Sequence, residues 1–201
     1  MGYSLSWIGV HAVAAGELYA KLGLAETGAR GFFGDFPTGG LTAPNGWQLI
    51  VANGCEHSII SSRVLSALST DAEVVACSIE EHVMYASAAF WQGGLEIWSV
   101  QHRGDRDIMD IVVKGSPPDQ FEALRTRYVA EQARENATSA EVDYIFEIPL
   151  ELARSIVPFR HDTSSPGIDD NDFGELQQEA TGLLGEGGGR PDAPTPWWKF
   201  W

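Results

Sequence analysis

The chain contains 201 residues, of which 44% are hydrophobic, so it can bury a core of ordinary size within one domain. Its formal charge is −15, with 28 acidic against 13 basic residues. Such a charge disfavours electrostatic binding to nucleic acid or to anionic membranes, whereas it is compatible with a basic protein partner.

Two cysteines, Cys55 and Cys77, are too few for a disulfide scaffold and are ordinary in a reducing compartment. The first residues lack a charged segment followed by a long apolar run, and no apolar stretch reaches the length of a membrane span. The sequence therefore predicts a cytoplasmic protein with no integral membrane contact.

The first elements of the chain are a strand and a short helix. Apolar side chains on both faces predict a strand at 3–11. Leu18 and Leu22 lie four residues apart before Gly23, which is typical of a short helix and its terminator. Residues 25–46 are rich in Gly, Thr and Pro, so we expect a loop or an irregular strand there.

Residues 47–79 have the pattern of a β-α-β unit. The run at 47–52 is almost entirely apolar, apolar residues repeat at helical spacing from 60 to 68, and residues 73–79 form a second apolar strand. The two strands should run parallel if they share a sheet.

Residues 79–92 permit two interpretations. Their apolar residues keep helical spacing, which favours a helix. Gly93 and Gly94 instead form a two-residue hairpin turn before a clear strand at 95–101, which favours a strand at about 84–91. We prefer the hairpin.

The elements that follow are a long helix, a strand and a short helix. Pro117 and Pro118 open a predicted helix of about twenty residues that Ser116 caps. Residues 144–150 then predict a last strand, and residues 152–157 a last short helix.

The composition of the chain changes after residue 161. Residues 1–161 form a predicted α+β domain, with a mixed sheet of about five to six strands and helices packed on it. Residues 162–196 form an acidic Gly/Pro-rich linker in which 172–184 could make a short helix, and residues 197–201 form an aromatic motif. The sequence thus predicts a flexible C-terminal tail after the domain.

Reactive side chains follow three predicted strands. The segments after the strands that end near residues 53, 79 and 101 would emerge at one edge of the sheet, where open α/β sheets bind ligands. These segments carry the candidate catalytic residues Cys55, His57, Glu81, His82 and His102.

Thiol, imidazole and carboxylate groups at this edge could bind zinc, or a Cys55 thiolate assisted by His82 or His102 could act as a nucleophile. Cys-x-His is not a standard zinc spacing, and no second cysteine lies nearby. Motifs for phosphate binding, serine hydrolysis and zinc proteolysis are also missing from the sequence. Solvated loop residues and caps are the simpler interpretation, so neither a metal nor a cofactor is predicted.

The aromatic motif is the most distinctive feature of the sequence. Its rings are those of Trp197, Trp198, Phe200 and Trp201. Rigid aromatic side chains dominate binding hot spots, so this motif could bind another protein, the chain's own domain or a second copy. A third hypothesis is contact of the motif with the interface of a membrane. The acidic linker opposes it, because anionic lipid repels negative charge.

A resemblance adds to this reading. It is carried by Cys77, Glu80-Glu81-His82-Val83-Met84, Trp91, Gly94, Trp98-Ser99-Val100 and His102. This stretch resembles a family of uncharacterised bacterial cytosolic proteins. The likeness extends over about residues 1–160 and to Pro196-Trp197-Trp198-Lys199. It implies a bacterial, cytosolic origin and assigns no catalytic residue.

We therefore expect a non-enzymatic acidic protein-binding module, such as an inhibitor, an immunity-type protein or an adaptor. It would use its acidic surface and its Trp-rich C-terminus to bind a protein partner or to self-associate. The alternative is a small hydrolase or transferase whose site is the Cys/His/Glu set at one sheet edge.

Overall fold

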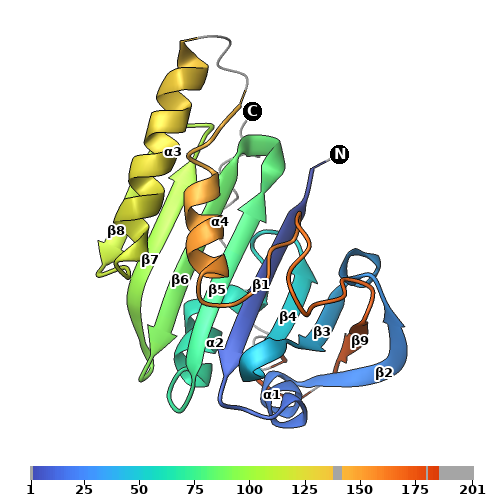
Figure 1. Cartoon of the computed structure of the whole chain (residues 1–201). Helices are drawn as coiled ribbons and strands as arrows, with labels where there is room; N and C mark the ends of the chain where they lie inside the picture. The colour runs from blue at the N-terminus through green and yellow to red at the C-terminus, as the bar shows by residue number, and fades with distance from the viewer. Residues whose placement is uncertain (1, 138–141, 180, 186–201) are drawn as a thin grey trace.

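The computed structural model describes residues 2–137, 142–179 and 181–185 (Figure 1). Over these ranges, one sheet of nine strands has the order β2-β9-β3-β4-β1-β5-β6-β7-β8, and every neighbouring pair is antiparallel. The strands are β1 (Ser4–His11), β2 (Leu24–Gly31), β3 (Thr38–Thr42), β4 (Gln48–Asn53), β5 (Glu73–Glu80), β6 (Tyr85–Gln92), β7 (Leu95–Arg103), β8 (Ile111–Gly115) and β9 (Phe173–Gln178). The helices are α1 (Ala15–Leu22), α2 (Ser62–Leu68), α3 (Gln120–Asn136) and α4 (Glu147–Arg154).

The predicted α+β class is confirmed, but the sheet is larger than expected and antiparallel rather than mixed. Part of the difference comes from residues 25–46, which supply most of β2 and all of β3 where the sequence suggested a loop or an irregular strand. Their many Gly residues have little local preference for a strand, so pairing with distant segments decides their conformation.

Strand β1 lies between the two strands of the expected β-α-β unit. Leu5 is the partner of Asn53 in β4 on one side and of Ile79 in β5 on the other. Both pairings are antiparallel, so β4 and β5 run in the same direction without touching. The local sequence predicts this direction correctly, whereas it contains no sign that a strand from the start of the chain is inserted.

The alternation of β1 builds a core on each face of the sheet. Trp7 belongs to the core formed with α3 and α4, and Ile8 to the core formed with α1 and α2. We call these sides the α3/α4 face and the α1/α2 face. Figure 1 shows α3 and α4 crossing one side of β5–β8, with α2 behind the sheet.

The preferred hairpin at 79–92 agrees with the structure. A short 3₁₀ turn at Glu81–Val83 follows β5, and β6 then pairs with β5 and β7. Gly93 and Gly94 have φ values of 60° and 77°, which a tight hairpin turn of this kind requires.

The expected strand at 144–150 is wrong, because α4 begins at Glu147. The Asp143 carboxylate accepts a hydrogen bond from the Phe146 N–H at 3.1 Å and so satisfies an amide at the start of the helix. Pro149 lies in the first turn, where a missing N–H is tolerated. Apolar residues that are buried on all sides produce no clear period in the sequence.

The expected helix at 172–184 is also wrong, because β9 pairs with β2 and with β3. Residues 162–179 and 181–185 therefore contribute to the domain, although the sequence placed them in a linker. The physical reason is long-range pairing, since strands formed by residues 24–31 and 38–42 supply the hydrogen bonds of β9. The rest of the predicted linker and the aromatic motif 197–201 lie outside the described residues.

The Phe173 side chain offers a test of this boundary. It is fully buried and packs edge-on against Phe33, with ring centroids 5.5 Å apart, and against Phe159. We expect Phe173→Ala to lower the free energy of unfolding by about 3–5 kcal/mol in urea titrations, because it leaves a cavity. The control Leu95→Ala removes an exposed side chain and should change stability by less than about 0.5 kcal/mol. Equal stabilities of the two variants would restore the linker reading.

Candidate functional site

The structure brings the ends of β4, β5 and β7 to one edge of the sheet, because all three strands run in the same direction. The side chains there are divided between the two faces. Glu80 lies on the α1/α2 face with its partner Tyr85, which in turn pairs with Arg103, whereas His102 lies on the α3/α4 face opposite Ala86. The edge therefore contains two separate groups of polar residues instead of one.

Cys55 is buried in the loop after β4. Its carbonyl accepts a hydrogen bond from the Ser78 hydroxyl, and its N–H donates to the Ser4 Oγ at 3.3 Å. Burial raises the pKa of the Cys55 thiol to about 11, and the nearby Glu80 and Glu56 carboxylates add to the shift. A thiol with this pKa is protonated at neutral pH and is a poor nucleophile.

The two candidate histidines near Cys55 have structural partners. His57 Nδ1 accepts a hydrogen bond from the Ile59 N–H at 3.2 Å, and burial lowers the pKa of its ring. His82 is exposed, and its Nδ1 lies 2.6 Å from Glu80 Oε1. Burial alone would raise the pKa of Glu80, but hydrogen bonds from Ser4 and His82 outweigh it and lower the pKa.

Glu81 and His102 belong to the α3/α4 face. The Glu81 carboxylate accepts the Tyr3 N–H at 2.8 Å and lies 3.0 Å from His161 Nε2, so it holds the start of β1 against the segment after α4. The buried His102 ring lies 2.6 Å from the Asp110 carbonyl and 2.9 Å from an Asp143 carboxylate oxygen. The ring therefore joins the loop before β8 to the segment before α4.

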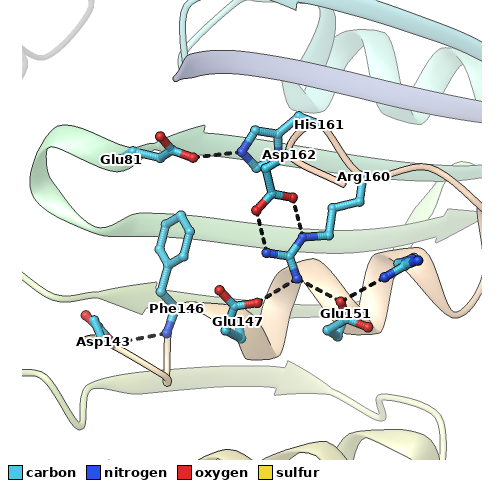
Figure 2. Close-up of polar contacts among 9 residues, drawn as sticks. Glu81, Asp143, Phe146, Glu147, Glu151, Arg160, His161 and Asp162 are labelled. Carbon is cyan, nitrogen blue, oxygen red and sulfur yellow. Dashed lines mark hydrogen bonds and ion pairs between the residues drawn. The ribbon is translucent and has the colours of Figure 1, made fainter. Parts of the chain in front are cut away.

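A polar cluster on this face is centred on Arg160, to which the sequence analysis assigned no role. Its guanidinium donates to Glu147 at 2.6 Å, to Glu151 at 2.7 Å and to both oxygens of Asp162 (Figure 2). Burial alone would lower the pKa of Arg160, but the Asp162 and Glu147 carboxylates raise it. Glu147 and Glu151 lie four residues apart and therefore share one side of α4. The sequence contains this helical spacing, but the interpretation of 144–150 as a strand hid it.

These contacts explain how α4 is held in place. Arg160 joins the chain after α4 back to two carboxylates on α4, and Asp143 caps the start of the same helix (Figure 2). Each carboxylate of this network accepts a hydrogen bond from another group of the protein. We call these residues the clamp, because they join α4 to the segments on either side of it.

Two adjoining cavities lie on the α1/α2 face. The first, which we call the Trp91 cavity, has a volume of about 190 Å³ and extends beneath α2. The second, the Glu80 cavity, has a volume of about 220 Å³. Tyr85 and Gln101 line both. Small side chains on this face of β6 and β7, including Ser87 and Ser99, leave the space that the Trp91 cavity occupies.

A third concave surface is the cleft between β8 and α3, which has a volume of about 530 Å³. We call it the β8/α3 cleft. It is lined by Met109, Ile111, Glu122, Arg125, Thr126, Val129, Ala130 and Ala133. Ile111 and Val113 of β8 face this side of the sheet, because they are the partners of His102 and Val100. Nothing in the sequence pattern indicated this cleft, since β8 is short and was not predicted.

The described residues contain no group of three or more His, Cys, Asp or Glu side chains arranged to hold a metal ion. No helix in the described part of the chain has the length and apolar character needed to cross a bilayer. Comparison of the chain with family models, with curated proteins and with solved structures finds no match in any of the three. The function must therefore be argued from the surfaces themselves.

The Cys55 environment leads to a chemical prediction. Because burial raises the pKa of Cys55 to about 11 and that of Cys77 to about 12, we expect neither thiol to react with a disulfide reagent in the native protein near pH 8. Both thiols should react once the protein is unfolded in denaturant. The variants Cys55→Ala and Cys77→Ala show which reaction comes from which cysteine. Rapid modification of native Cys55 would show a reactive thiolate and revive the enzymatic reading.

The clamp predicts a pH dependence of stability. Burial alone would raise the pKa of Asp162, but its hydrogen bonds with Arg160 lower it below the ordinary value. A lowered folded-state pKa stabilises the protein above the ordinary carboxyl range, and this stabilisation is lost as the pH falls through the folded value. We therefore expect the wild-type unfolding midpoint in urea to fall below about pH 4, and to fall less steeply in Asp162→Asn.

Asp71→Asn, which alters an exposed carboxylate in the turn before β5, is the control for this experiment. It should retain the steep acid dependence of the wild type. An equally steep fall in Asp162→Asn would show that the clamp does not couple folding to pH.

Proposed function

We propose that this protein is a non-enzymatic binding module that binds an extended segment of a partner protein along β8. The sheet has two outer strands, β2 and β8, and the contrast between these two edge strands is the observation that carries the proposal. One edge has the features that prevent strand pairing, and the other has an exposed apolar strand beside a cleft.

The protected edge is β2. Its exposed residues include Glu26 and Arg30, the register shifts between these two residues, and Gly28 has a φ of 89°. Charged side chains and an irregular register keep other strands from pairing at such an edge. This edge is therefore closed to a partner strand.

The open edge is β8, which pairs only with β7 among the described residues. Of the six exposed large hydrophobic residues in the described chain, two lie on β8, one lies shortly before it, and two lie at the start of the neighbouring strand β7. These five are Leu95, Ile97, Met109, Val112 and Val113. Alternate residues of an edge strand point their N–H and C=O groups outward, so a partner segment can extend the sheet.

The β8/α3 cleft would give this pairing its specificity. Side chains of an added strand alternate between faces, so every second one would lie over the cleft against Val129 and Ala133 of α3. The charge of −15 favours basic residues in the partner. We therefore expect an extended segment with alternating apolar side chains and basic flanks.

The enzymatic alternative has no comparable support. Its proposed nucleophile, Cys55, is a buried thiol with a raised pKa, and its bases are divided between the two faces of the sheet. His102, in particular, is separated from Cys55 by the sheet itself. No observation therefore favours a second candidate function.

Selection of peptides from a displayed random library on the full-length protein tests this proposal. Enriched peptides should bind wild type at least about tenfold more tightly than Val113→Lys, because the lysine replaces an exposed apolar side chain on the side of β8 that faces the cleft with a charge. The matched control is Ala29→Lys, which adds the same charge at the exposed β2 edge and should leave the affinity unchanged. Hydrogen exchange should show new protection of the β8 amides when a peptide binds.

Both variants must first be shown to keep the wild-type unfolding midpoint, so that a loss of binding cannot come from unfolding. Equal binding to wild type and Val113→Lys would refute the β8 site. Loss of binding in both lysine variants would show that the peptides respond to net charge alone, which also contradicts the proposal.

A further inference from the structure

The Trp91 cavity has the size of one six-membered ring. Its volume is about 190 Å³, and a protein cavity of about 150 Å³ can hold a benzene molecule. The cavity lies on the α1/α2 face, between Leu65 of α2 and a floor formed by β5, β6 and β7. A ligand that fits this space is therefore a small molecule or a single ring of a larger one.

An irregularity of the sheet places a charge at the wall of this cavity. The register between β6 and β7 shifts after Phe90, so Trp91 pairs with Glu96 and not with Ile97. In a regular ladder, the apolar Ile97 would stand opposite Trp91. Bulges of this kind redirect side chains and are frequent beside functional sites. The backbone thus places a carboxylate where a regular ladder would place an isoleucine.

The lining offers both donors and acceptors of hydrogen bonds. Trp91 is only 8% exposed, and its indole N–H has no acceptor among the described residues, which is rare for a buried donor. Burial raises the pKa of the Tyr85 hydroxyl, so this group stays protonated and can donate near neutral pH. Glu96 supplies an acceptor, and the Ser99 Oγ donates to it at 2.9 Å. A matching ligand must therefore both donate and accept hydrogen bonds.

These groups disfavour two common classes of small ligand. An anion would be repelled by Glu96 and by the net charge of −15. An ammonium ion would suit the carboxylate, but it has no lone pair that could accept the Trp91 N–H. A neutral hydroxyl group can do both, because it carries one O–H donor and two lone pairs.

Apolar groups of the lining complement the polar ones. Ile60 and Leu65 form one wall, and Ala76 and Ala89 belong to the floor on β5 and β6. Small-molecule sites typically combine such apolar surfaces with a few placed polar groups. A six-membered sugar ring has C–H groups on its faces and hydroxyls around its rim, so it can contact the apolar walls and form hydrogen bonds at once.

We propose that the Trp91 cavity binds one neutral six-membered sugar ring, whose hydroxyls accept the Trp91 N–H and donate to Glu96. The site is a binding site and not a catalytic one. It is independent of the partner site on β8, because it lies on the other face of the sheet and takes a different class of ligand.

Nuclear magnetic resonance of the full-length protein labelled with ¹⁵N tests this site. Trp91 gives one of seven tryptophan indole N–H signals, and the signal lost in Trp91→Phe identifies it. The probes are glucose, galactose, mannose and N-acetylglucosamine. A ligand with about a dozen non-hydrogen atoms binds with a dissociation constant on the order of 1 mM, so each sugar is titrated to about 50 mM. We expect at least one of them to shift the Trp91 signal saturably.

Variants at the wall and the floor connect this shift with the cavity. Glu96→Ala removes the acceptor and should weaken binding about tenfold, whereas Glu96→Gln keeps an acceptor oxygen and should weaken binding less. Ser99→Phe fills the cavity and should abolish the saturable shift. Ser164→Phe adds the same ring at an exposed serine outside the cavity and should behave as wild type.

Each other outcome overturns the proposal. No saturable shift with any of the four sugars would show that the cavity does not bind this class of ligand. Equal losses in Glu96→Ala and Glu96→Gln would show that the ligand requires a negative charge and not an acceptor. A shift retained in Ser99→Phe at an unchanged unfolding midpoint would place the sugar elsewhere. Glu96 is exposed, so the two Glu96 variants decide the question even if Ser99→Phe does not fold.

Discussion

The pairing of β1 with both β4 and β5 is the constraint on which the rest of the structure depends. Because β1 is antiparallel to each neighbour, β4 and β5 must run in the same direction, and the β6 hairpin then gives β7 that direction as well. The alternation of Trp7 and Ile8 on β1 divides the apolar residues into two cores. The pairing of β1 thus determines that β4, β5 and β7 end on the same side of the molecule. It also determines the face of the sheet on which each side chain lies.

Features that depend on local pattern could be predicted from the sequence, and features that depend on distant pairing could not. The strands around Trp7, Ile50 and Val75 have strong apolar runs, and Gly93-Gly94 marks a hairpin whatever surrounds it. By contrast, β2 and β9 are polar segments that become strands because each pairs with the other across more than a hundred residues. The start of helix α4 escaped prediction, although a helix was expected from residue 152, because that start depends on the Asp143 side chain and on burial from several sides.

The candidate site shows the same limit at the scale of single side chains. The direction of the strands predicts that Cys55 and His102 leave the sheet at one edge, but neighbouring residues on a strand point to opposite faces. Only the register shows that His102 joins Asp143 on the α3/α4 face while Gln101 lines the cavities on the other. The environment of Cys55 is also non-local, since Ser78 and Glu80 of β5 enclose its loop. Reactive residue types were thus visible in the sequence, whereas their protonation and grouping were not.

The two faces of the sheet differ in how closely their side chains are packed and paired. On the α3/α4 face, Arg160, His161 and His102 join separate segments, and the β8/α3 cleft lies at the outer strand of the sheet. On the α1/α2 face, the small side chains of β6 and β7 leave space beneath α2. A strand added at β8 would extend the sheet sideways and would not enter that space. A strand bound at β8 would therefore leave the space beneath α2 unchanged.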